Sequence, residues 1–193
     1  MEIGARVPEF SARTYFPNED KIEKLNIPVA GKWTIITFHP GDFTFVCATD
    51  IEAFGAMQEQ FEKNGAVVLA VSTDSIFAHR VWHQTSPRVS KTNIPLVEDA
   101  SKAISSAYGF LSSNGASARR GIVIIDPEGN LQYYAVFNDA LGKDVKHIYN
   151  AFLGLKSIHD APKQEGKMSA IPANWEPGKP MLVVDTTKDI GKL

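Results

Sequence analysis

The chain has 193 residues, a formal net charge of −2, 44% hydrophobic residues and 22% charged residues. This length suits one domain with a sizeable core, and the composition is that of an ordinary globular protein. A charge so close to neutral gives no basis for a nucleic-acid partner. The single cysteine excludes a disulfide within the chain, so the fold does not depend on oxidation.

The sequence signals of several other classes of protein are absent from this chain. The first residues contain no apolar signal-peptide core, and no apolar run approaches membrane-spanning length. We therefore expect a cytoplasmic protein without a membrane partner. The chain has no glycine-rich dinucleotide motif after a strand, no phosphate loop and no serine-hydrolase elbow. These observations predict a protein that needs no nucleotide or flavin cofactor.

The N-terminal half begins with a segment that we expect to be irregular, residues 1–30, because three prolines interrupt it. The first predicted strand is Thr34–Phe38, a short apolar run rich in β-branched residues. Apolar residues then recur at helical spacing over residues 50–63, which predicts a helix. Residues 66–72 are apolar at nearly every position, which is typical of a strand covered on both faces.

The next elements are shorter. A helix is predicted over residues 76–84, with Asp74 or Ser75 as its N-cap. Residues 94–97 form a short strand that Pro95 limits to an edge or end position, because proline cannot donate to a sheet ladder.

The C-terminal half completes an alternation of strands and helices. Its predicted elements are a helix, a polar loop, two strands joined by a turn, and an amphipathic helix: residues 101–108, 112–118, 121–125, 131–137 and 143–156. The alternation predicts an α/β protein with a mixed central sheet flanked by helices. We expect residues 1–160 to form the domain. Residues 161–193, whose first part is rich in proline, glycine and lysine, should form an extended C-terminal arm of the same unit.

Cys47 lies at the transition from the first predicted strand to the first predicted helix, in or just before the first helical turn. Unpaired N–H groups and a partial positive charge at that end of a helix favour the thiolate, which is the reactive form of cysteine. Thr44 lies one helical turn before Cys47, so its hydroxyl can reach the sulfur or an oxygen bound beside it. Pro40 lacks an N–H and presents an apolar wall. On composition alone, a small buried hydrophobe remains the alternative interpretation of a lone cysteine.

The pattern Pro40-x-x-x-Thr44-x-x-Cys47 resembles the active-site signature of the peroxiredoxins, close to their typical two-cysteine or alkyl hydroperoxide reductase C branch. The resemblance continues through residues 71–83, the strand that follows Arg120 and the segment 172–178. It implies a thioredoxin-like fold, although the thioredoxin Cys-x-x-Cys motif is absent.

The resemblance also assigns a role to Arg120, which would lie near the sulfur, stabilise the thiolate and bind a peroxide oxygen. Arginine suits this task because it keeps its proton and offers a fixed fork of donors. The spacing to Asp126 selects Arg120 over its neighbour Arg119. Without the motif, a surface ion pair would be the better interpretation.

Four other polar residues have weaker signals. We interpret His39 as a wall of the site, with a general base as the alternative. His79 and His83 could share a helix face, but no further ligands complete a metal site, so no metal is expected. Asp50 stands where the family commonly has glutamate, and we expect it to join a hydrogen-bond network with an arginine.

These residues predict a thiol-dependent peroxidase that reduces hydrogen peroxide and organic hydroperoxides through a sulfenic acid on Cys47. In the typical two-cysteine family a second cysteine precedes the Pro-x-x-Trp segment of the arm, and here Ile171 occupies that place. We therefore expect an external thiol to complete the cycle: glutathione, or a glutaredoxin- or thioredoxin-like protein. The alternatives are a peroxide sensor or redox relay, and a ring-forming chaperone that does not need Cys47. The resemblance implies a homodimer, with a decamer of five such dimers as a further assembly.

Overall fold

The computed structural model describes residues 1–189 and 191 of the chain. Its contacts separate two compact units, Met1–Val145 and a second unit that begins at Lys146. All four residues predicted to form the site, Cys47, Thr44, Pro40 and Arg120, lie in the first unit. In the described part of the chain, no helix is long and apolar enough to cross a membrane.

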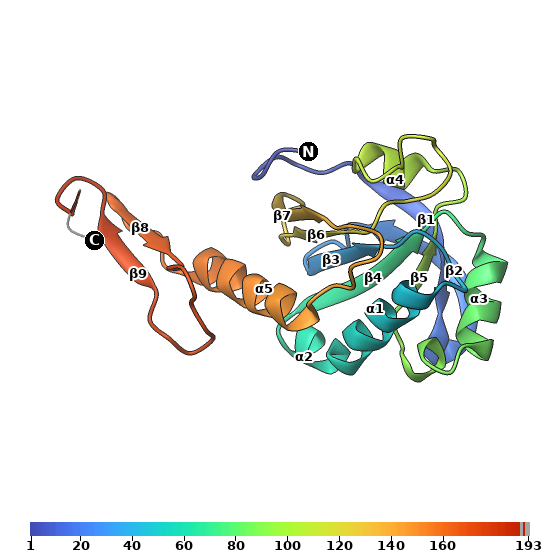
Figure 1. The fold of residues 1–193 in the computed structure, drawn as a ribbon. Helices are drawn as coiled ribbons and strands as arrows, with labels where there is room; N and C mark the ends of the chain where they lie inside the picture. Colours follow the sequence, from blue (N-terminus) through green and yellow to red (C-terminus); the bar gives the residue numbers. More distant parts are fainter. Residues whose placement is uncertain (190, 192–193) are drawn as a thin grey trace. The chain divides into compact units, whose positions relative to one another are not determined.

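A seven-stranded mixed sheet, in the order β2-β1-β5-β4-β3-β6-β7, forms the centre of the first unit (Figure 1). The strands are β1 Phe10–Phe16, β2 Lys21–Ile27, β3 Trp33–Phe38, β4 Ala66–Ser72, β5 Leu96–Glu98, β6 Gly121–Ile125 and β7 Leu131–Val136. β3 runs parallel to β4 and antiparallel to β6. The predicted α/β class with a mixed central sheet is confirmed, and β7 lies at one edge of the sheet.

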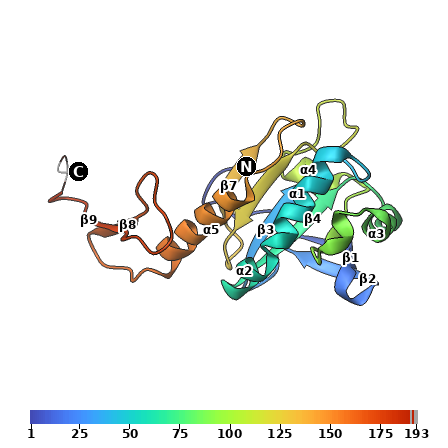
Figure 2. The same cartoon turned by 60° about the horizontal axis from the view of Figure 1, so that its bottom comes forward.

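Helices cover both faces of this sheet. They are α1 Phe45–Ala56, α2 Gln58–Lys63, α3 Ile76–Thr85 and α4 Ala103–Ala107, together with the short 3₁₀ helices η1 Pro17–Glu19 and η2 Val89–Lys91. Figures 1 and 2 show α4 on one face and α1, α2 and α3 on the other. The side chain of Ser75 accepts a hydrogen bond from the N–H of Ala78, so it caps α3 as predicted.

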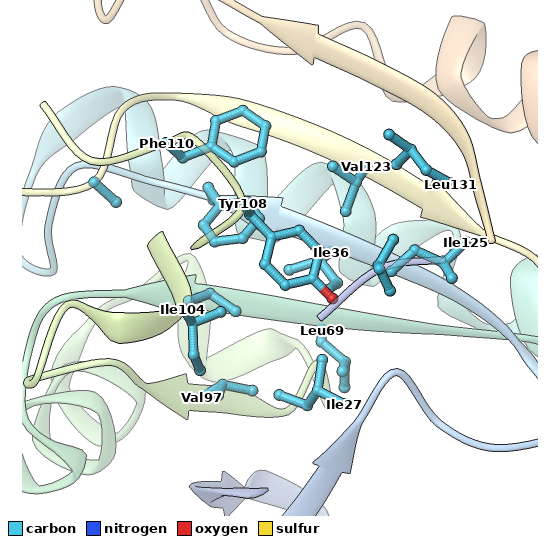
Figure 3. Close-up of a cluster of buried hydrophobic side chains, with 14 residues drawn as sticks. Ile27, Ile36, Leu69, Val97, Ile104, Tyr108, Phe110, Val123, Ile125 and Leu131 are labelled. Atoms are coloured by element: carbon cyan, nitrogen blue, oxygen red, sulfur yellow. The ribbon is translucent and has the colours of Figure 1, made fainter. Parts of the chain in front are cut away.

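The central strands are buried on both faces, as their apolar runs predict. Every residue of β3 is buried. On the α4 face, alternate residues of neighbouring strands pack into one cluster (Figure 3). Gly121 opens β6 beneath this cluster, and a Cβ there would lie 1.9 Å from Cε1 of Phe110. The close approach of that ring to the backbone therefore requires glycine.

The expectation of an irregular N-terminal segment is wrong. β1 and β2 form an antiparallel hairpin in which Phe10 lies opposite Ile27 and Phe16 opposite Lys21. The prolines flank these strands instead of interrupting them, as strand ends tolerate a missing N–H. Asp20 closes the turn with a φ of 47°.

Two further predictions need correction at their boundaries. The first helix begins at Phe45, earlier than expected, and it is divided from α2 at Met57. β5 lies between β4 and β1, not at a sheet edge. Pro95 is tolerated there because it precedes the strand, and its carbonyl accepts the N–H of Ala70 at 3.0 Å.

The second unit contains most of α5, Val145–Asp160, and a hairpin of β8, Lys167–Ala170, with β9, Leu182–Asp185. The arm thus has regular structure of its own. The side chains of Ile171 and Trp175 pack beside Gly154 of α5. These contacts lie within the second unit, which therefore contains most of α5 together with the arm. The sequence instead predicts a domain boundary after residue 160. That domain boundary stays a prediction.

Two glycines within helices allow a matched test of packing. A Cβ on Gly55 would lie 2.4 Å from Cγ2 of buried Thr92, whereas a Cβ on Gly154 meets nothing closer than 3.5 Å. Gly55→Ala should lower the free energy of unfolding by about 1–3 kcal/mol, because overpacking outweighs the better helix propensity. Gly154→Ala should leave it unchanged or raise it by up to about 1 kcal/mol. Urea unfolding of both variants measures this, and equal effects would contradict the close approach at Gly55.

Candidate active site

Cys47 occupies the first turn of α1, where the sequence predicts it, and its side chain is buried. The loop from Pro40 to Phe43 turns the chain from the end of β3 into this helix. Phe43 has a φ of 57°, in the left-handed region that few residues other than glycine adopt. Thr44 then takes the N-cap position with extended backbone angles. Cys47 therefore belongs to the turn whose backbone N–H groups have no partner within the helix.

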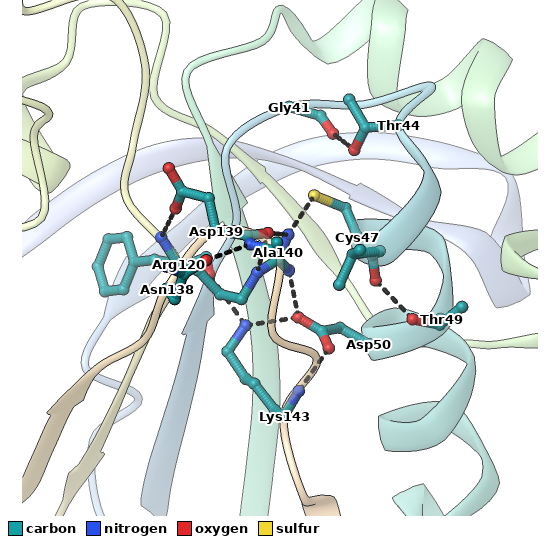
Figure 4. Close-up of polar contacts among 12 residues, drawn as sticks. Gly41, Thr44, Cys47, Thr49, Asp50, Arg120, Asn138, Asp139, Ala140 and Lys143 are labelled. Carbon is teal, nitrogen blue, oxygen red and sulfur yellow. Dashed lines mark hydrogen bonds and ion pairs between the residues drawn. The ribbon is translucent and has the colours of Figure 1, made fainter.

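Arg120 is buried and contacts the sulfur directly. Sheet register explains this position, because Phe38 at the end of β3 lies opposite Gly121 at the start of β6. Nη2 of Arg120 donates to Sγ of Cys47 at 3.4 Å (Figure 4). Nε and Nη2 also donate to the carbonyl of Asp139, at 3.1 Å and 2.9 Å. Arg119, the alternative in the sequence, is exposed.

Asp50 joins the network that the sequence suggests. It lies on α1 just after Cys47, is buried, and accepts from Nη1 of Arg120 at 2.5 Å. Its carboxylate also accepts from Nζ of Lys143 at 2.8 Å and from the Lys143 backbone N–H at 2.9 Å. The shorter aspartate side chain therefore still reaches the arginine.

Lys143 is the site residue that sequence reasoning missed. Its side chain is fully buried, and Nζ donates to the carbonyl of Phe38 at 3.1 Å as well as to Asp50. One signal could have identified it. A lysine at the predicted start of a helix interacts unfavourably with the helix dipole, which indicates that its charge has another partner.

Burial and neighbouring charges shift the pKa values of Asp50, Lys143 and Arg120 in opposite directions. Burial would raise the pKa of Asp50, but the charge and hydrogen bonds of Lys143, with the charge of Arg120, hold that pKa below its ordinary value. Burial lowers the pKa of Lys143 despite the attraction of Asp50. Burial also opposes the charge of Arg120, but its contacts with Cys47 and Asp50 raise the pKa of Arg120. Two buried cations thus face one buried carboxylate, and a thiolate on Cys47 would balance the charge.

Thr44 and Pro40 lie on the same loop. The hydroxyl of Thr44 donates to the carbonyl of Gly41 at 2.8 Å, not to the sulfur (Figure 4). Because its proton is committed there, the oxygen can only accept a further hydrogen bond. Pro40 is half-buried and follows the buried His39. The loop thus supplies a hydroxyl oxygen that can accept a hydrogen bond one turn before Cys47, and Arg120 supplies an N–H donor to the buried sulfur.

The histidines do not form a shared metal pair. His79 faces Asp42 and the carbonyl of Val97, whereas His83 faces the carbonyl of Thr92. Within residues 1–189 and 191, no group of three or more His, Cys, Asp or Glu side chains is arranged to hold a metal ion.

Comparison with known proteins matches residues 3–134 to a sequence model described as the AhpC/TSA family. Residues 164–192 match a model described as the C-terminal domain of 1-Cys peroxiredoxin. A chloroplastic 2-Cys peroxiredoxin of Arabidopsis thaliana is 36% identical over 186 residues, or 95% of this chain and 68% of that protein. Alkyl hydroperoxide reductase C of Amphibacillus xylanus is 33% identical over 176 residues, or 91% of each chain.

Solved structures share the fold. The reduced 2-Cys peroxiredoxin of Plasmodium vivax superposes with a TM-score of 0.85 at 28% identity, covering 94% of this chain and 92% of that one. AhpC of Mycobacterium tuberculosis gives a TM-score of 0.74 at 28% identity, covering 83% and 94%. These similarities confirm the predicted thioredoxin-like fold.

The buried charges generate a stability prediction. Lys143→Met should lower the free energy of unfolding at pH 7 by about 3 kcal/mol, because it removes one partner of a buried carboxylate. The pKa of Asp50 is depressed, so its stabilising contribution should be present above about pH 4 and lost as pH falls further. Urea unfolding between pH 2 and 7 measures both effects.

The matched control is Lys146→Met, at an exposed position on α5. This variant should change the free energy of unfolding by less than about 0.5 kcal/mol. If the two variants were equally stable, the Lys143 ammonium would not be needed to hold Asp50.

Proposed function

Because the chain belongs to the AhpC/TSA family of peroxiredoxins, we propose that Cys47 is the nucleophile of this thiol-dependent peroxidase. The proposal rests on one contact: an N–H of Arg120 is directed at Sγ of Cys47, with Nη2 3.4 Å from the sulfur. Cys47 itself lies in the first turn of α1. Both features stabilise negative charge on sulfur, and the thiolate is the nucleophilic form. A cysteine that served only as a small buried hydrophobe would not need a guanidinium beside its sulfur.

The first step is attack by the Cys47 thiolate on the terminal oxygen of a hydroperoxide. A sulfur–oxygen bond forms while the oxygen–oxygen bond breaks, and the sulfur is oxidised by two electrons. The leaving oxygen takes a proton and departs as water or an alcohol, and Cys47 becomes a sulfenic acid. The substrates proposed are hydrogen peroxide and organic hydroperoxides.

Thr44 and Arg120 would hold the peroxide in line with the sulfur. Thr44 can accept the O–H of the peroxide, since its own proton goes to Gly41. The guanidinium of Arg120, whose Nη2 is already directed at the sulfur, would stabilise the charge developing on the leaving oxygen. Pro40 would shield the site from water without offering a competing donor.

Completion of the cycle requires a thiol from outside the chain, because the sequence has one cysteine and Ile171 replaces a resolving one. The match of residues 164–192 to a C-terminal domain of 1-Cys peroxiredoxin supports this cycle. The proposed reductant is glutathione, or a glutaredoxin- or thioredoxin-like protein. Its attack on the sulfenic acid releases water and leaves a mixed disulfide, which a second thiol reduces. Such thiols are abundant in the reducing cytoplasm, which is the proposed location.

Assembly into a homodimer, and five dimers into a decamer, is also part of the proposal. β7 ends the seven-stranded sheet, and residues 132–136 of it are only half-buried. An edge strand has unpaired backbone groups that invite pairing with a second chain, and a two-fold dimer is the commonest closed solution. Sedimentation of the reduced protein at micromolar concentration should give a dimer or a larger species. A monomer would contradict the assembly.

The single-cysteine cycle predicts the masses of the oxidised protein. Excess peroxide should add two oxygens to the intact chain, because a waiting sulfenic acid proceeds to sulfinic acid. Glutathione supplied together with one equivalent of peroxide should instead add one glutathione. On a non-reducing denaturing gel the peroxide-treated protein should stay at monomer mass. A stoichiometric disulfide-linked dimer would exclude this cycle.

Two variants control this experiment. Cys47→Ser should show neither mass change and no peroxide consumption, and residual turnover would remove Cys47 from the mechanism. Arg120→Lys keeps the charge but loses the fork of donors, so sulfenic acid formation should slow by about 10²–10³-fold. Steady-state turnover with several thiols separates a peroxidase from a peroxide sensor, which would turn over slowly with all of them.

A further inference from the structure

Two buried histidines contact a buried aspartate of the loop that leads to Cys47, and none of the three has a part in the peroxide step described above. Asp42 belongs to this loop, and its carboxylate lies between the two rings. Nε2 of His39 is 3.1 Å from one oxygen, and Nδ1 of His79 is 2.7 Å from the other. All three side chains are fully buried. We call them the Asp42 cluster.

The partners of His79 determine its charge. Its Nε2 lies 3.1 Å from the carbonyl of Val97, which can only accept a hydrogen bond. The carboxylate of Asp42 also only accepts, so both ring nitrogens must donate and His79 is an imidazolium. Burial would lower the pKa of His79, but the hydrogen bond and charge of Asp42, with the charge of Asp74, raise it above the ordinary value.

His39 has the opposite character. It needs only one N–H to satisfy Asp42, and its Nδ1 has no partner among the described residues. Burial lowers the pKa of His39 by more than the hydrogen bond and charge of Asp42 raise it, and the charges of His79 and Lys143 lower it further. One charged and one neutral histidine therefore share the carboxylate of Asp42.

The backbone next to Asp42 shows what this ion pair supports. Phe43 has a φ of 57°, and such a conformation persists only where neighbouring contacts hold it. On one side Thr44 begins α1. On the other side the N–H of Asp42 donates to Oδ2 of Asp74 at 2.9 Å, while its carboxylate is held by His79 from α3. Asp74, in the segment between β4 and α3, and His79 of α3 thus fix the strained turn that places Thr44 before Cys47.

We propose that His79 is a positioning residue for peroxide reduction, acting as an imidazolium that holds Asp42 and thereby the loop of residues 40–44. The inference rests on the proposed role of Cys47. When His79 loses its proton, one ring nitrogen becomes an acceptor that faces another acceptor, and one of the two contacts is lost. The loop then loosens, and Thr44 no longer holds the peroxide in line with the sulfur.

The first test uses the unmodified protein. The rate of sulfenic acid formation in a single turnover with hydrogen peroxide is measured from pH 5 to 10, and the ring protons of His79 are titrated by NMR. The rate should fall at high pH with the same midpoint as the titration of His79. A rate that does not fall there would overturn the inference, as would a fall that follows a change in sedimentation instead. If no sulfenic acid forms at any pH, the proposed function itself has failed.

Three variants separate positioning from a structural role. His79→Gln can donate to only one of the two acceptors, so the rate near pH 6 should drop about 10–100-fold and the fall at high pH should vanish. Asp42→Asn should keep most of the rate and lose the fall, because its amide can donate to a neutral His79 that still donates to Val97. His83→Gln, on the same helix but outside the Asp42 cluster, should keep the profile of the unmodified protein.

The variants can also contradict the inference. His79→Gln with an unchanged rate and pH profile, but a lower melting temperature, would show a purely structural role. The same change of profile in His83→Gln would show a general effect of α3. If His79→Gln does not fold, the titration of the unmodified protein together with Asp42→Asn decides the question.

Discussion

The placement of Asp50 between Arg120 and Lys143 is the interaction on which the site depends. A buried carboxylate is unfavourable unless cations and hydrogen bonds compensate it, and here two cations do so. The second cation leaves the trio with an excess positive charge. That excess lies beside Cys47, because Arg120 contacts both the carboxylate and the sulfur. The same arrangement that stabilises Asp50 therefore stabilises an anion on sulfur.

This trio also connects distant parts of the chain. Asp50 comes from α1, Arg120 from the residue before β6, and Lys143 from the segment before α5. The ammonium of Lys143 reaches back to the carbonyl of Phe38 at the end of β3. The end of the central strand, the helix that carries the sulfur and the residue that opens β6 are thus joined by charge-assisted hydrogen bonds, which are stronger than neutral ones.

The sequence predicted the parts of the site that depend on local pattern. Cys47, Thr44 and Pro40 lie in one loop between a recognisable strand and helix, and Arg120 directly precedes a clear strand. Lys143 is difficult to predict because its role depends on a partner 93 residues away, and its one local signal is its unfavourable position at a helix start. In the fold, three prolines in the first 30 residues predict an irregular segment, but they lie at strand ends, so the first hairpin does not follow from the pattern. The order of the strands also could not be read, since it follows from contacts between segments far apart.

The register between β3 and β6 has a consequence for how the chain tolerates insertions. Successive side chains of a strand point to opposite faces, so a shift of one residue exchanges every inward position for an outward one. Such a shift in β6 would bring Arg119 in place of Arg120 and move Gly121 away from the ring of Phe110. The turn at residues 126–130 follows the other end of this strand, away from the sulfur. A single residue inserted into or deleted from Gly121–Ile125 would move the guanidinium of Arg120 away from the sulfur, even if no other residue of the site changed.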